Sequence, residues 1–120
     1  MKSKVQKKKY DLEERTAKFG EKVIELTQKV KKTPITIPLI SQLVRSGTSI
    51  GANYYEANGA SSKKDFKNKI SICKKEARET KYWLRMLAKA DKLVGEECRN
   101  VWQEAQELTL IFSKIIINTK

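Results

Sequence analysis

Histidine is absent from this chain of 120 residues, and only two cysteines, Cys73 and Cys98, are present. Without histidine there is no imidazole metal ligand, no Ser-His or Cys-His nucleophile pair, and no imidazole general base. Two cysteines are too few for a disulfide framework, and they favour a reducing, cytoplasmic setting. The sequence therefore predicts a protein that is not an enzyme and that needs no cofactor or metal.

Long apolar segments are also lacking. No run of 18 apolar residues occurs, so we expect no transmembrane helix. The first ten residues, MKSKVQKKKY, are basic, but no apolar segment of the signal-peptide type follows them, so we expect no secretion signal. The length favours a single domain with a modest core.

Apolar residues recur at helical spacing in every long segment, and no segment alternates with the period of two that is typical of strands. In the first segment, for example, Leu12, Phe19 and Val23 fall on one stripe. Turn signals at Pro34, Gly59 and Gly95 interrupt the pattern. We therefore expect four helices, over about 11–32, 37–58, 62–91 and 96–118.

Four helices of this length with short connections predict an all-α fold, an antiparallel up-down-up-down four-helix bundle. We expect the bundle domain to span 10–120. Residues 1–9 hold five lysines and no acid, and we expect them to form a flexible basic arm. Ser62, three residues before Asp65, is placed to cap the third helix.

Two glycines stand out in the second expected helix. Gly47 and Gly51 fall at the centre of its apolar arc, although a glycine inside a helix costs about 1 kcal/mol relative to alanine. Small residues let two helices approach closely. We therefore predict that another helix packs closely against this stretch.

The opposite face of the second helix is polar but carries no lysine, in a chain whose net charge is +12. A solvated helix face of this protein would be expected to carry several lysines. We predict that this face is covered by another subunit. Alternatively, its side chains hydrogen-bond within the bundle and orient the second and third helices. The face consists of Arg45, Ser49, Asn53 and Glu56.

The third expected helix separates its charges. Residues 63–92 hold eleven Lys and Arg against four Asp and Glu. On a helical wheel the acids Asp65, Glu76 and Glu79 fall on one side of the apolar stripe, next to a second apolar patch of Ile72, Trp83 and Met86. We expect this patch in a subunit interface. The cations fall on the other side, and we call six of them the basic flank: Lys67, Lys74, Arg78, Lys81, Arg85 and Lys89.

A helix with separated charges can serve either binding or assembly. The basic flank can bind an anionic partner such as nucleic acid. It can also pair with the acids of a neighbouring subunit, head to tail, in a closed ring. The simplest alternative is ordinary surface charge beside one extra packing contact.

The segment SQLVRSGTSIGANYYEANGASSKKDFKNKISICKKEARETKYWLRML, residues 41–87, resembles the four-helix-bundle family of proteins encoded in intervening sequences of bacterial 23S ribosomal RNA genes, also called S23 ribosomal proteins. The pattern consists of Arg45, Ser49-Ile50, Asn53, Glu56, a turn at Gly59, and Asp65-Phe66. Where the family has a Glu-Gly pair, Ala57-Asn58 separates Glu56 from Gly59 here.

This resemblance implies a helical bundle without established enzymatic activity, assembled as a homopentamer. The family is also distantly similar to accessory proteins of diversity-generating retroelements, which are basic pentamers that partner a reverse transcriptase and bind nucleic acid. Our leading interpretation is a non-enzymatic homo-oligomer that binds nucleic acid, RNA above all, mainly through its phosphates. The alternative is a protein-interaction scaffold whose basic surface binds an acidic protein partner.

Overall fold

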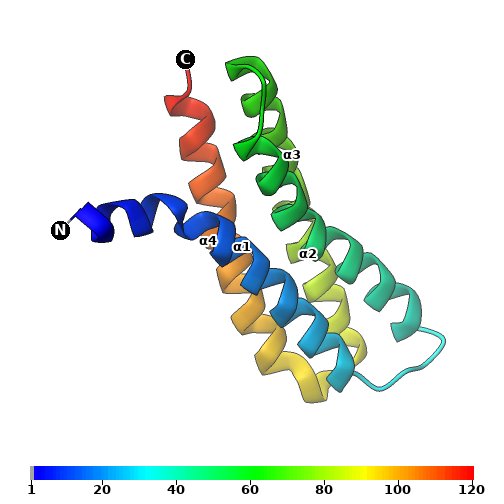
Figure 1. Ribbon diagram of the computed structural model, residues 1–120. Coiled ribbons are helices and arrows are strands. Elements are labelled where there is room, and N and C mark those ends of the chain that lie inside the picture. Colours follow the sequence, from blue (N-terminus) through cyan, green and yellow to red (C-terminus); the bar gives the residue numbers. More distant parts are fainter. Residues whose placement is uncertain (1) are drawn as a thin grey trace.

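The computed structural model describes the backbone of residues 2–120 and the side chains from Leu12 onward. Four long helices make up the structure, as Figure 1 shows, and this confirms the all-α prediction. They are α1 (Lys2–Lys29), α2 (Thr36–Asn58), α3 (Lys63–Ala90) and α4 (Gly95–Asn118), with a 3-10 turn, η1 (Lys92–Val94), before the last.

The helices run up and down alternately, so that each is antiparallel to the next (Figure 1). α3 packs along both α2 and α4, whereas α1 packs mainly on α2 and meets α4 over a shorter stretch. Arg15 strengthens that shorter contact, since its Nε lies 2.6 Å from Oε2 of Glu104 and its Nη2 lies 2.7 Å from Oε1 of Glu107.

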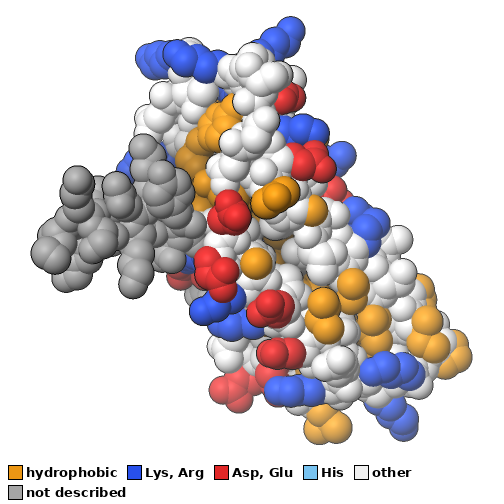
Figure 2. All heavy atoms as spheres, viewed as in Figure 1, with side chains coloured by type: hydrophobic (Ala, Val, Ile, Leu, Met, Phe, Trp, Pro, Cys, Tyr) orange, Lys and Arg blue, Asp and Glu red, His pale blue; other side chains and the backbone are white. Residues whose placement is uncertain are grey.

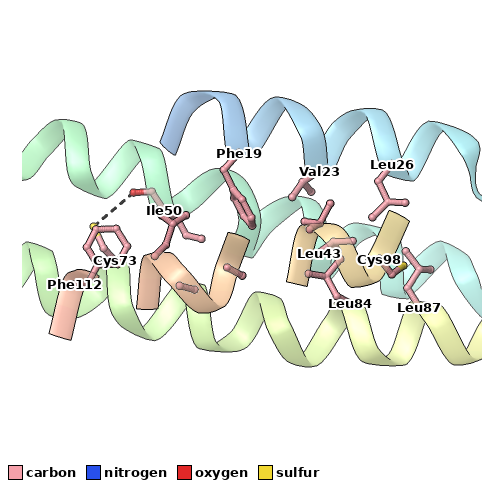
Figure 3. Close-up of a cluster of buried hydrophobic side chains, with 14 of the residues drawn as sticks. Phe19, Val23, Leu26, Leu43, Ile50, Cys73, Leu84, Leu87, Cys98 and Phe112 are labelled. Atoms are coloured by element: carbon pink, nitrogen blue, oxygen red, sulfur yellow. Dashed lines mark hydrogen bonds between the residues drawn. The ribbon is translucent and has the colours of Figure 1, made fainter. Parts of the chain in front are cut away.

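The core lies between all four helices. Figure 3 shows Phe19 and Val23 of α1, Leu43 of α2, Leu84 of α3 and Phe112 of α4 pointing into it. All of these side chains are buried. Cys73 and Cys98 are buried and unpaired among them, which confirms their placement on the apolar stripes of α3 and α4. The cytoplasmic setting inferred from them stays a prediction.

The helix ends follow the turn signals closely. Ser62 caps α3 as predicted, because its Oγ accepts a hydrogen bond of 3.0 Å from the Asp65 amide. Gly59 ends α2 with a φ of −101°, so this turn does not use the left-handed conformation common at helix ends. Asp91, between α3 and η1, contacts the loop that follows α1, and the sequence did not predict this contact. Its carboxylate accepts from the amides of Lys31 and Leu93, both at 3.1 Å.

The first helix ends at Lys29, earlier than the expected residue 32. Thr36, at the start of α2, explains the difference, because its buried hydroxyl donates to the Lys31 carbonyl at 2.6 Å and accepts from the Thr33 amide at 2.9 Å. These bonds hold the connecting loop in a non-helical course. The prediction of a flexible arm over 1–9 falls outside the residues whose side chains are described, and it stays a prediction.

In the described part of the chain, no helix is long and apolar enough to cross a membrane. Within the same part, no cluster of three or more Cys, Asp or Glu side chains could hold a metal ion.

Candidate nucleic-acid interface

The basic flank of α3 borders α4. Lys81 fixes this orientation: its Nζ donates to Oε1 of Gln106 at 2.5 Å and lies 5.3 Å from the ring centroid of Trp102. Lys67, Arg78, Arg85 and Lys89 are exposed, whereas Lys74 and Lys81 are partly buried. Lys74, Arg78, Lys81 and Arg85 thus lie along the groove between α3 and α4.

None of these six cations forms an ion pair with a residue whose side chain the structure describes. Two acids near the flank are engaged elsewhere. Glu104 and Glu107 of α4, the helix next to the flank, both bind Arg15 of α1. The basic flank therefore presents uncompensated positive charge.

The acidic side of α3 faces α2 instead. Arg45 of α2 places Nη1 3.3 Å from Oε1 of Glu76, and Nη2 pairs with Glu79. Glu79 also accepts from Nε1 of Trp83 at 3.2 Å. Both acids therefore pair with an arginine of the same subunit, which weakens the expectation that they pair with cations of a neighbouring copy.

The polar face of α2 makes further bonds within the chain. The Ser49 hydroxyl donates to the Arg45 carbonyl at 2.6 Å, and Nδ2 of Asn53 donates to the Ser49 carbonyl at 2.8 Å. Glu56 lies 2.8 Å from Nζ of Lys69 on α3, and this hydrogen bond raises the pKa of the lysine. This pattern fits the alternative in which the face orients α2 and α3. A subunit interface here stays a prediction.

The second apolar patch also stays a predicted interface. Ile72 is exposed, whereas Trp83 and Met86 are partly buried. Tyr82 stacks edge-on against Trp83, with ring centroids 5.0 Å apart. The patch therefore presents an apolar surface beside the Arg45 ion pairs.

The two glycines of α2 lie against α1. A Cβ built on Gly51 would sit 3.2 Å from the Thr16 carbonyl oxygen, which is backbone. A Cβ on Gly47 would sit 2.9 Å from Cγ2 of Val23, which is a side chain. Backbone approaches backbone at Gly51, therefore, while Gly47 makes room for a core valine.

Two residues of α4 join the basic flank although the sequence reasoning did not place them there. Arg99 and Trp102, one turn apart, line a pocket of about 360 Å³ together with Arg85 of α3. A second hollow of about 630 Å³ is lined by Lys74, Arg78 and the neighbouring Lys75, among others. The spacing of Arg99 and Trp102 in the sequence places both on one side of α4. The sequence did not show that this side meets the cations of α3.

Comparison with known proteins identifies relatives over almost the whole chain. The family model for 23S rRNA-intervening sequence proteins matches residues 8–114. A crystal structure of a protein of unknown function from the S23 ribosomal protein family of Bacteroides thetaiotaomicron is 32% identical in sequence. The alignment covers 87% of this chain and 96% of that one, with a TM-score of 0.77. No curated protein matches the chain.

Proposed function

Because this chain belongs to the family of 23S rRNA-intervening sequence proteins, we propose that it is a non-enzymatic homo-oligomer that binds nucleic acid, RNA above all, through phosphate contacts. The observation that carries this proposal is the division of charge on α3. Arg45 pairs with Glu76 and Glu79 on the side toward α2, and the six cations of the basic flank form no ion pair with a described side chain.

The length of the basic flank suits a nucleic-acid backbone. Lys67 and Lys89 are 22 residues apart, which corresponds to roughly 33 Å along an α-helix. That distance spans about ten phosphates of one strand in a duplex. Each phosphate that a cation neutralises releases counterions, so binding is favoured at low salt and weakened steeply as salt rises.

Phosphate contacts carry no sequence code, so the basic flank alone binds unrelated sequences with similar strength. RNA is the proposed natural target because of the family's association with 23S rRNA. The test is titration of RNA and DNA of unrelated sequence against the protein over a range of salt, with and without the cations of the flank.

Exposed apolar residues support the homo-oligomer. Ile35 and Ile37, at the start of α2, are 68% and 55% exposed. Figure 2 shows hydrophobic side chains gathered at the lower right, over this part of α2. Surfaces of this kind are commonly buried by association. The number of five subunits is proposed from the family resemblance.

A binding partner of another class would use the same surface. The hollow beside Lys74 and Arg78 also has Ile116 in its lining, and this mixture of cationic and apolar groups suits an acidic protein segment. Recovery of the same protein partner from a lysate before and after nuclease treatment would favour this alternative. Loss of the captured material with nuclease would favour nucleic acid.

A further inference from the structure

The pocket at the η1 end of the groove between α3 and α4 combines two chemistries. Leu84, Ala88 and Cys98 contribute apolar lining, and the first and last of these belong to the buried core drawn in Figure 3. Burial raises the pKa of the Cys98 thiol to about 11, so the thiol is neutral at physiological pH. The interior of the pocket is therefore uncharged.

The rim of the pocket is cationic. Arg85 comes from α3 and Arg99 from α4, and neither forms an ion pair with a described side chain. A guanidinium is planar and binds phosphate through two parallel hydrogen bonds. Two such groups, one from each helix that lines the pocket, suit the phosphates on either side of a nucleotide.

The indole of Trp102 supplies an aromatic surface in the lining of the same pocket. Lys81 lies over the ring and is itself bonded to Gln106, so the indole is held by a cation–π contact on the side of the basic flank. The pocket has a volume of about 360 Å³, which lies within the range of known ligand sites. Aromatic side chains in such places bind unpaired bases by stacking.

We propose that this pocket accepts an unpaired base of single-stranded nucleic acid, stacked on Trp102, with its flanking phosphates bound by Arg85 and Arg99. The inference rests on the proposed function, since the basic flank delivers the strand to the pocket. In a duplex the bases are paired and stacked on one another, so they cannot enter. The protein therefore prefers single strands over duplexes.

The rest of the groove does not share these properties. The hollow beside Lys74, Lys75 and Arg78 has no aromatic residue in its lining. The other tryptophan, Trp83, is bonded to Glu79 on the acidic side of α3. The emission of Trp83 is thus a matched control. Trp83 lies on α3 and is also partly buried, but it lies beside an acid instead of the basic rim.

The first test uses the emission of Trp102 alone, in a Trp83→Phe variant. A short RNA of mixed sequence is titrated as a single strand and again after annealing to its complement. The single strand is expected to quench the emission and the duplex is not. The reciprocal variant, Trp102→Phe, leaves only Trp83, whose emission should not change with either.

The second test compares affinities. Base stacking on an aromatic side chain contributes roughly 5- to 150-fold per base, so Trp102→Leu should weaken single-strand binding at least about 5-fold. Phosphate contacts alone would favour the duplex, which carries more charge. Trp102→Leu should remove the preference for single strands and leave duplex affinity unchanged. Should Trp102→Leu fail to fold, the emission test on the Trp83→Phe protein still decides.

The outcomes separate the two proposals. Binding of both forms without quenching, and without preference for the single strand, would overturn the base pocket and leave phosphate binding standing. Absence of binding to either form at low salt would overturn the proposed function, and the base pocket with it.

Discussion

Arg45 and Glu76 join α2 to α3, with Nη1 of the arginine 3.3 Å from Oε1 of a glutamate that is only 9% exposed. The pair turns the acidic side of α3 toward α2 and leaves the basic side facing α4. It also gives the lysine-free face of α2 a role inside the subunit. The arrangement of charge over the whole molecule depends on this contact.

Replacing Arg45 with alanine should therefore destabilise the fold. The change leaves the largely buried Glu76 without its partner, and because Arg45 itself is about half exposed we expect a loss of about 1–2 kcal/mol in the free energy of unfolding. Urea denaturation measures this. Arg78→Ala, which removes an exposed arginine of α3 that pairs with no described side chain, should stay within about 0.5 kcal/mol.

The same variant tests the predicted subunit interface on this face. If Arg45→Ala dissociated the oligomer and left the stability of the subunit unchanged, the arginine would belong to the contact between copies. Retention of the native mass with lower stability is the expected result.

Neutralising four cations of the basic flank should weaken nucleic-acid binding. Lys74, Arg78, Lys81 and Arg85 are changed together to glutamine, and the slope of log affinity against log salt should become shallower by about 3, since each lost phosphate contact contributes about 0.7–0.9. Fluorescence anisotropy with RNA and DNA of unrelated sequence provides the measurement.

A matched control removes the same charge elsewhere, at the exposed residues Lys18, Lys22, Lys31 and Lys120. This control variant should change the slope of log affinity against log salt far less than the flank variant does. Deleting residues 1–9 should have a smaller effect of the same kind as the flank variant. Dissociation of the flank variant into monomers would instead assign these cations to assembly.

The apolar patch of Ile72, Trp83 and Met86 predicts a second measurable property, the mass of the native particle. Light scattering should show an oligomer, and Ile72→Asp should dissociate it because a carboxylate would be buried in the interface without a partner. Leu93→Asp is the control, since Leu93 is 93% exposed in the η1 turn. A wild-type monomer would contradict the assembly.

Gly51 should not tolerate even one added carbon. Alanine there would place its Cβ 3.2 Å from the Thr16 carbonyl oxygen, and a backbone atom cannot rotate away. The strain of about 1–3 kcal/mol from overpacking exceeds the gain of about 1 kcal/mol in helix propensity. We expect Gly51→Ala to lower the free energy of unfolding by about 1 kcal/mol, and Gly51→Leu by more.

Gly95 offers the opposite case. A Cβ on it would meet no atom within 4 Å, and its φ of −58° is already helical. Gly95→Ala should therefore raise the free energy of unfolding by about 0.4–1 kcal/mol. Equal effects at the two glycines, measured by urea denaturation, would refute the close approach of α1 and α2.

Alkaline pH should destabilise the protein through its cysteines. Burial raises the pKa of Cys73 to about 12, above the ordinary thiol value of 9.0, and that of Cys98 to about 11. Above pH 9 the unfolded thiols lose protons that the folded ones keep, so the free energy of unfolding falls as pH rises toward the folded values. Cys73→Ala should reduce this fall in the free energy of unfolding between pH 9 and 10.5. A wild-type free energy of unfolding that does not change with pH in that range would contradict the prediction.

The four helices, and the limits of α2, α3 and α4, could be predicted from the sequence because both are local properties. The limits of α1 could not, since it begins at Lys2 and ends at Lys29 instead of at about 11 and 32. Apolar residues at helical spacing identified the core stripe that carries Phe19 and Val23, and Ser62 was identified as the residue that caps the start of α3. The separation of acids from cations on α3 is equally local, since a helical wheel follows from residue numbers alone. Family membership also followed from the pattern between Arg45 and Phe66.

Only the tertiary structure decided what each side of α3 faces. A wheel gives the angle of Glu76 or Lys81 from the apolar stripe, but not which neighbouring helix lies at that angle. Arg45 meets Glu76 across 31 residues, and Lys81 meets Trp102 because α3 and α4 pack at one particular register. The packing of whole helices determines such contacts. It therefore decided that Glu76 and Glu79 pair with an arginine, that the cations of the basic flank pair with no described acid, and that Trp102 lies beside them.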